Sequence, residues 1–210
     1  MLPIHILTGE TAMLNRRALL ITSVAVPFAG AARAAGADTA LAFVEQLGRD
    51  LIAVVNGAGS VADKQAGLEK IIDRDVDVAV VARFCLGRFW RSATLDQQRD
   101  YTASFRKVLV KNITGKVGEY QGVTLVVGKA QAREEDIAVA SIVTRPNNAP
   151  SKVDWIVNAA AGAPKVVDVV AEGTSLRLTQ RSDYAAFMSR NNNDIQALIE
   201  AIHKQASQPG

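Results

Sequence analysis

The spacing of apolar residues changes twice along this chain, and the two changes define the class of fold that it can adopt. From Asp38 to about Ile113 the apolar residues recur every three or four positions, as they do on one face of an amphipathic helix. Beyond Tyr120 they alternate with polar residues, which is the period of a half-buried β-strand. The helical period returns after Gly173. We therefore expect an α+β domain with N-terminal helices, a four-stranded antiparallel twisted sheet and C-terminal helices.

Polar turns and capping residues set the expected limits of these elements. Asp77, Thr94 and Asp194 each precede an apolar-periodic segment and are expected to cap helices at their N-termini. The helices are expected near residues 38–55, 61–72, 77–86, 94–113, 182–188 and 194–202, and the strands near 123–127, 137–143, 153–157 and 165–171. No internal repeat or long linker divides this region, so a single domain is expected.

The N-terminal segment has the pattern of a secretory signal. Arg16 and Arg17 precede an apolar run at residues 18–29, which is too short to span a bilayer. The run is followed by Ala32-Arg33-Ala34, an A-x-A cleavage pattern. We expect cleavage after Ala34, which leaves residues 35–210 as the mature domain. Met13 is the natural start, so residues 1–12 are interpreted as an upstream extension.

This signal changes the charge and the expected location of the protein. The whole chain carries a formal net charge of +3, and loss of Arg16, Arg17, Arg33 and Glu10 lowers it to +1. Without Ser or Thr before the arginine pair, or Phe-Leu-Lys after it, the Sec route is favoured over twin-arginine export. The product is expected to be exported to the periplasm.

The chain is poor in residues that perform chemistry. Cys85 is its one cysteine, so no intramolecular disulfide can form, and His203 lies in a C-terminal segment that is expected to fray. The sequence contains no nucleophile-elbow, dinucleotide-binding or P-loop motif. Residues 73–77 imitate the start of a calcium loop, but Val78 and Phe84 occupy the positions that need glycine and glutamate. No metal site or catalytic residue is expected.

A basic stretch interleaved with aromatic residues runs from Arg83 to Lys116, where eight basic residues stand against two acidic ones. Such a pattern can bind single-stranded nucleic acid, but an exported protein rarely meets that partner. The simplest interpretation is that the aromatic side chains face the core and the basic ones face solvent. The alternative is a cationic surface that meets phospholipid head groups or an acidic protein.

Several motifs in this stretch and in the C-terminal half resemble the MlaC family of auxiliary components of ABC transporters, also known as toluene-tolerance proteins. Residues 82–94, ARFCLGRFWRSAT, resemble the family segment A-R-x-x-L-G-x-x-W-R-x-A-T. The segments VDW at 153–155, KVVDV at 165–169, EGTSL at 172–176 and TQRSDY at 179–184 follow in the family's order. The resemblance extends from Asp38 to Lys204.

The resemblance implies a monomeric periplasmic phospholipid carrier without a cofactor. Such a carrier shuttles lipid between an outer-membrane lipoprotein complex and an inner-membrane ABC transporter with a membrane-anchored substrate-binding component, and so supports outer-membrane lipid asymmetry. A related branch is associated with hopanoids. Pro164, Thr174 and Asn191-Asn192-Asn193 depart from the family pattern, so a hopanoid or another apolar ligand remains an alternative cargo.

The resemblance also implies an apolar pocket between the sheet and the helices. The residues expected to line it are Phe89, Trp90, Phe105 and Leu109 from helices, with Trp155, Val157, Val169, Thr174 and Leu176 from the sheet and its exit. Lys152 and Arg177 are candidates for contact with the head group. Burial of each CH₂ group contributes about 0.8 kcal/mol, so a carrier needs no reactive side chain to hold acyl chains.

Two other classes of function remain open from the sequence. One is a small cone-shaped α+β enzyme in which Asp154 or Asp168 acts as a general base within an apolar pocket. The other is an exported structural adapter with a filled core and no cavity.

Overall fold

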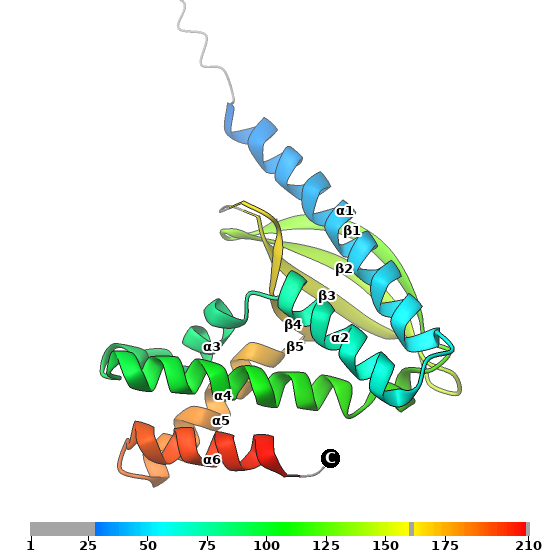
Figure 1. Ribbon diagram of the computed structural model, residues 1–210. Helices are drawn as coiled ribbons and strands as arrows, with labels where there is room; N and C mark the ends of the chain where they lie inside the picture. The colour runs from blue at the N-terminus through cyan, green and yellow to red at the C-terminus, as the bar shows by residue number, and fades with distance from the viewer. Residues whose placement is uncertain (1–27, 160–161, 209–210) are drawn as a thin grey trace, which may run out of the picture.

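The computed structural model describes residues 28–159 and 162–208, and it confirms the α+β class (Figure 1). The helices are α1 (Phe28–Asn56), α2 (Val61–Asp75), α3 (Val78–Leu86), α4 (Leu95–Thr114), α5 (Leu176–Arg190) and α6 (Ile195–Ser207), with 3₁₀ helices η1 (Gly87–Arg91) and η2 (Val117–Tyr120). The strands are β1 (Thr124–Arg133), β2 (Asp136–Thr144), β3 (Ser151–Asn158), β4 (Lys165–Ala171) and β5 (Thr174–Ser175).

The strands form one antiparallel meander in the order β1-β2-β3-β4-β5. The four expected strands are all present, and the two-residue β5 is added at the edge of β4. Glu172 and Gly173 connect β4 to β5 with φ angles of 49° and 79°, the conformation of a tight hairpin turn. A strand of two residues shows no alternation, so the sequence pattern could not reveal it.

One face of the sheet is covered by α1, and the other face is covered by α3 and α5 near β4. Figure 1 shows α1 lying along the sheet, where Val44 packs against Val139 and Val157. The opposite face is covered near β4, where α3 and α5 pack and where Ile156 and Val167 are buried. The helices α4 and α6 lie side by side, below the sheet in the view of Figure 1.

The expected caps are present where the helices begin. The Asp77 side chain accepts a hydrogen bond from the Val80 backbone N–H at 3.0 Å. Thr94 forms a reciprocal capping box with Gln97, and Asp194 caps α6. These short polar side chains satisfy backbone donors that the first helical turn leaves unpaired.

The helix expected at residues 182–188 begins earlier than its apolar pattern suggested. It starts at Leu176 because the Ser175 side chain accepts a hydrogen bond from the Leu178 N–H at 3.1 Å and caps the helix. Leu176 and Leu178, in the first turn of this helix, are exposed. The start of the helix therefore has no regular apolar face that the sequence pattern could reveal. Leu176 is therefore the first residue of α5.

The expected signal segment lies mainly outside the described residues, which begin at Phe28. The backbone of α1 passes through Ala34, and cleavage after that residue stays a prediction. Among the helices described here, none is both long and apolar enough to cross a membrane.

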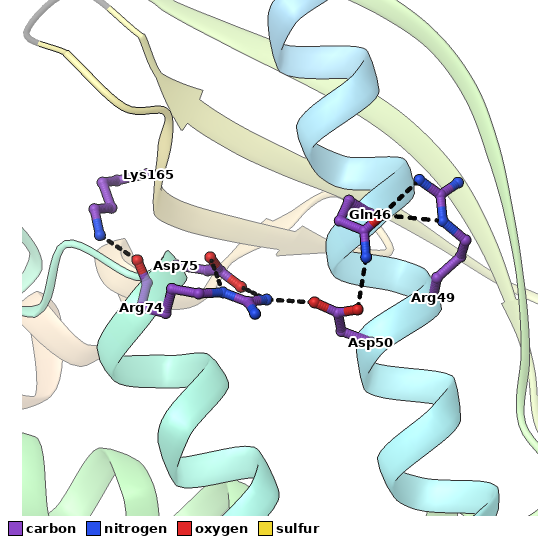
Figure 2. A network of polar contacts seen from close by, with 6 residues as sticks. All are labelled: Gln46, Arg49, Asp50, Arg74, Asp75 and Lys165. Carbon is purple, nitrogen blue, oxygen red and sulfur yellow. Dashed lines mark hydrogen bonds and ion pairs between the residues drawn. The ribbon is translucent and has the colours of Figure 1, made fainter.

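A polar network joins α1, α2 and β4 (Figure 2). The Arg74 guanidinium contacts Asp50 at 2.5 Å and the buried carboxylate of Asp75 at 2.7 Å. The Lys165 ammonium donates to the Arg74 backbone carbonyl, and Gln46 donates to Asp50 at 2.7 Å. These contacts join the C-terminal half of α1 and the C-terminal end of α2 to the start of β4.

The network makes the stability of the fold depend on pH. The hydrogen bond from Arg74 holds the pKa of Asp50 below its usual value, and the bond from Gln46 acts in the same direction against the raising effect of burial. A carboxylate with a lowered pKa in the folded state stabilises the fold above its unfolded pKa of about 4, and this contribution is lost as the pH falls through the folded pKa. We expect the free energy of unfolding in urea to fall between about pH 5 and pH 3, and to fall less in Asp50→Asn.

The matched control is Asp38→Asn, which removes an exposed carboxylate from the same helix. It should retain the pH dependence of the unchanged protein. An Asp50→Asn variant with the same dependence as the Asp38→Asn variant would contradict this role of the network.

Candidate functional site

The four pocket residues expected from helices lie together in one helical core. Phe105 is buried, and Phe89, Trp90 and Leu109 are half-buried against it. The Tyr101 ring lies between them, with centroid distances of 6.4 Å to Trp90 and 6.0 Å to Phe105. The structure therefore brings this group together, with α5 and α6 completing its surroundings.

Three of the residues expected from the sheet lie on the face that packs against α1. Val157 is fully buried, and Trp155 and Val169 are half-buried beside it. Trp155 Nε1 donates to Ser141 Oγ at 3.0 Å, which satisfies the polar end of the ring. This group belongs to the clusters under α1 and not to the helical core, so the two predicted groups form separate apolar regions.

Thr174 and Leu176 lie at the junction of β5 and α5, and both are exposed. Leu176 has an exposed fraction of 53%, and Leu178 beside it has 54%. The two leucines are two positions apart at the start of α5, so their side chains point to different sides of the helix. Leu176 was predicted from the sequence and Leu178 was not, because nothing in a single sequence distinguishes an exposed leucine from a core leucine.

A buried carboxylate organises this junction. Asp168 on β4 accepts hydrogen bonds from the Ser175 hydroxyl at 2.5 Å, the Val169 N–H at 2.8 Å and the Arg177 N–H at 3.0 Å. Its Oδ2 also lies 3.5 Å from Nε of Arg177. The carboxylate thus joins β4 to the first turn of α5, and its oxygens are occupied by structural partners.

Aromatic and basic residues meet beside the same junction. The guanidinium carbons of Arg177 and Arg181 lie 4.5 Å and 5.0 Å from the centroid of the Phe84 ring. Arg177 was a sequence candidate for contact with a head group, whereas Phe84 and Arg181 were not. The available signal was the four-residue spacing of the two arginines, which places them one helical turn apart.

Lys152, the other head-group candidate, is exposed on β3. It pairs with Ile142, and Asp168 pairs with Ile156, so Lys152 and Asp168 lie on the same face of the sheet, opposite α1. The Lys152 backbone N–H donates to a Glu172 carboxylate oxygen at 2.5 Å.

A surface groove of about 560 Å³ lies between α3, η1 and α4. Trp90 and Val78 form part of its wall together with Leu95, whose exposed fraction is 80%. Arg99 and Arg106 also line the groove, and both pair with acidic side chains. Trp90 is the one predicted pocket residue at this groove.

In the basic stretch from Arg83 to Lys116, aromatic side chains face the core and basic side chains face solvent, which was the simplest interpretation of the sequence. Tyr101 and Phe105 point into the helical core, and most of the basic residues are exposed. Burial raises the pKa of Tyr101 and of Tyr184, so both phenols stay protonated near neutral pH.

The remaining candidates for chemistry have structural roles. Burial, followed by the charge of Asp168, raises the pKa of the Cys85 thiol to about 12, which leaves it a poor nucleophile. The carboxylates of the calcium-like segment diverge, with Asp73 bonded to Arg106, Asp75 to Arg74 and Asp77 to the start of α3. Within residues 28–159 and 162–208 no cluster of three or more His, Cys, Asp or Glu side chains could hold a metal ion.

The family model described as MlaC protein matches residues 46–204 of this chain, which is most of the described region. The toluene tolerance protein Ttg2D of Pseudomonas putida is 26% identical over 136 residues. That alignment covers 63% of this chain and 63% of the relative, so the chain spans less than two-thirds of the relative's length.

Among solved structures, the chain is similar to the phospholipid-binding protein from Ralstonia solanacearum in complex with a phospholipid. The TM-score is 0.71 at 23% sequence identity, and the match covers 80% of this chain and 97% of that chain. The two proteins share one fold, with helices on a meandering antiparallel sheet.

Proposed function

This chain belongs to the MlaC protein family, and we propose that it is a periplasmic carrier that binds phospholipid by its acyl chains. The observation that carries the proposal is the similarity of the fold, over 80% of this chain, to a protein whose structure contains a phospholipid. Family membership and the toluene-tolerance relative support the same assignment. The cargo is carried from one membrane to the other without a chemical reaction.

The apolar regions supply what a carrier needs. The helical core and the cluster under α1 hold seven of the nine proposed lining residues, and Thr174 and Leu176 are exposed at the junction of β5 and α5. Acyl chains that enter between these regions lose contact with water, which stabilises the complex by about 0.8 kcal/mol for each CH₂ group. Lys152 and Arg177 are proposed to contact the head group.

Binding without catalysis fits the state of the titratable groups. Asp168, one of the two carboxylates that the enzyme hypothesis considers as a base, accepts hydrogen bonds from Ser175 and from the α5 backbone. The Cys85 thiol is protonated near neutral pH. These groups hold the fold together and are not positioned to transfer protons to a ligand.

We further propose that the carrier acts as a monomer between an outer-membrane lipoprotein complex and an inner-membrane ABC transporter. The sequence motifs shared with the family support this placement, as does the expected signal at residues 1–34. Such a route requires a carrier that releases its lipid at each membrane.

Mass spectrometry of organic extracts from the purified mature protein tests the proposal. We expect about one two-chain phospholipid for each protein molecule, because burial of two acyl chains gives an affinity that survives purification. A hopanoid in the extract would assign the protein to the alternative cargo. A lipid-free protein that turned over small ketones would contradict carriage and support the enzyme hypothesis.

A further inference from the structure

We propose that lipid enters and leaves this protein at the seam between α2 and α4, and that Arg106 closes the seam through its ion pairs with Glu69 and Asp73. The seam is the pair of surfaces with which α2 and α4 face each other. The inference rests on the proposed carrier function and goes beyond it by naming the place of cargo entry and the contact that controls it.

The first observation is that the seam divides two separately packed layers. Tyr101, Phe105 and Val108, which are the buried apolar residues of α4, pack with α3, α5 and α6. Leu68 and Ile71 of α2 pack instead with α1, η2 and β4. The two helices are neighbours, yet no apolar cluster in the part of the chain that the structure describes contains residues of both (Figure 1). Separation of α2 from α4 therefore breaks no shared apolar cluster.

The second observation is the set of charged hydrogen bonds that crosses the seam. Arg106 Nε donates to Asp73 Oδ1 at 2.8 Å, and its Nη2 donates to Asp73 Oδ2 at 2.6 Å and to Glu69 Oε1 at 2.9 Å. The two carboxylates are four residues apart and share one face of α2, so one guanidinium reaches both. The bond from Arg106 also holds the pKa of Asp73 below its usual value, so this carboxylate is charged near neutral pH.

These ion pairs can open and close. The side chains of Arg106, Glu69 and Asp73 are 35%, 45% and 46% exposed, and ion pairs with this much exposure contribute little free energy because water and salt screen them. Two nitrogens of the planar guanidinium bind one carboxylate in parallel, which fixes the direction of approach. Arg106 thus holds one closed arrangement of the seam without making the closure permanent.

The third observation is that α2 is fastened more firmly on its other contacts. On the side that faces α1, Arg74 pairs with Asp50. The two residues that connect α2 to α3 are fixed to β4, because Val76 forms a β-bridge with Val166 and the Asp77 N–H donates to the Val166 carbonyl at 3.0 Å. The flank of α2 that faces α4 is therefore the place where the two layers can part.

The fourth observation is an apolar groove that reaches the seam. Arg106 lines the surface groove of about 560 Å³ between α3, η1 and α4, together with Thr102 and Ala103 on the same face of α4 and Ala79 on α3. The groove follows α4 from Leu95 to Arg106, a rise of about 16 Å along the helix. Its small side chains leave room for a narrow apolar group, so an acyl chain can lie on apolar surface before it passes the seam.

Transfer of a fluorescent lipid from the protein to vesicles tests the proposal. The purified protein is loaded with a phosphatidylcholine that carries a fluorescent acyl chain, and its release into vesicles of dioleoylphosphatidylcholine is followed over time. We expect Arg106→Gln to raise the rate constant of transfer by about fivefold, because the seam opens more often. Entry and release both become faster, so the equilibrium affinity should stay within about twofold.

Salt supplies a second readout that a purely structural role would not change. Raising NaCl from about 0.05 M to about 0.5 M screens exposed ion pairs. The rate constant of transfer should therefore rise in the unchanged protein and change much less in Arg106→Gln. The variant Asp73→Asn should give a smaller rise than Arg106→Gln, since Glu69 still binds the guanidinium. The double variant should be no faster than Arg106→Gln alone, because both changes break the same contact.

Arg99→Gln is the matched control. Arg99 lies on α4 and lines the same groove, but its acidic partner Asp96 belongs to the same helix, so this pair does not cross the seam. Asp50→Asn controls for a general loss of stability, since it weakens the contact of α2 with α1 and leaves the seam intact. Both variants should transfer lipid at the unchanged rate.

Each other outcome overturns a defined part of the inference. A transfer rate in Arg106→Gln equal to that of the unchanged protein would overturn the seam as the entry site and leave lipid carriage in place. An equal rise in Asp50→Asn would show that general loosening of α2 governs transfer and would overturn the same placement. Failure of the unchanged protein to bind the fluorescent lipid would overturn the carrier function itself.

A conservative variant keeps the test decisive where Arg106→Gln does not fold. Arg106→Lys retains the charge but loses the planar guanidinium, so it should transfer lipid at a rate between those of Arg106→Gln and the unchanged protein. A rate equal to that of the unchanged protein would contradict closure by the bidentate contact. Circular dichroism and urea unfolding of each variant establish that it is folded.

Discussion

Replacement of Asp168 by alanine is expected to lower the free energy of unfolding by about 3–5 kcal/mol. The carboxylate is buried and accepts hydrogen bonds from Val169, Ser175 and Arg177. The substitution removes these acceptors together and leaves the Arg177 guanidinium without its acidic partner. Because the lost contacts join β4 to α5, we expect chemical denaturation to show a lower midpoint and an earlier loss of helical signal.

Asp154→Ala is the matched control, since Asp154 lies on the adjacent strand and faces the same side of the sheet. It is only half-buried, and the expected loss is below about 1 kcal/mol. Equal effects of the two substitutions would show that the hydrogen bonds of Asp168 do not hold the junction. A loss of lipid in Asp168→Ala without a loss of stability would instead indicate that the carboxylate acts on the cargo.

Leu176→Glu is expected to reduce the lipid that copurifies with the protein to a small fraction of the unchanged level. Leu176 is 53% exposed, so a glutamate there should change the free energy of unfolding little. At the first position of α5 its negative charge also interacts favourably with the positive end of the helix dipole. The same charge beside acyl chains is strongly unfavourable because a carboxylate cannot be desolvated cheaply.

Val61→Glu provides a control that places the same charge on an exposed apolar residue at the same local position. Val61 is the first residue of α2, and its exposed fraction is 61%. Lipid content should remain at the unchanged level in this variant. If a folded Leu176→Glu protein kept its lipid, the placement of Leu176 at the cargo would be wrong, and equal losses in both variants would indicate a general effect of added charge.

Local signals in the sequence were sufficient to locate most of the secondary structure. Asp77, Thr94 and Asp194 cap helices as expected, because capping depends on a side chain and on backbone groups two or three residues away. The strand segments were found from alternation together with the polar turns between them, since the fourth segment, KVVDVVA at residues 165–171, does not alternate. The start of α5 was misplaced because Ser175 caps a first turn whose leucines are exposed.

The grouping of the proposed pocket residues could be predicted only in part. Phe105 and Leu109 lie in one core because they are four residues apart on one helix, and that relation is present in the sequence. Trp155 lies under α1 in a separate cluster, and no spacing in the sequence indicates which helix covers which face of a sheet. The packing of elements that are distant in sequence decided this division.

The sequence by itself determined the order of helices and strands, the limits set by caps and turns, and the scarcity of reactive groups, because each of these depends on residue type and short-range spacing. The tertiary structure alone decided that Phe84 meets Arg177 and Arg181, residues more than ninety positions away in the chain. It also decided that Asp168 serves as a structural acceptor and that Leu176 and Leu178 face solvent. These relations arise when α3 and α5 pack together against β4, and contacts between distant segments leave no periodic signal in a single sequence.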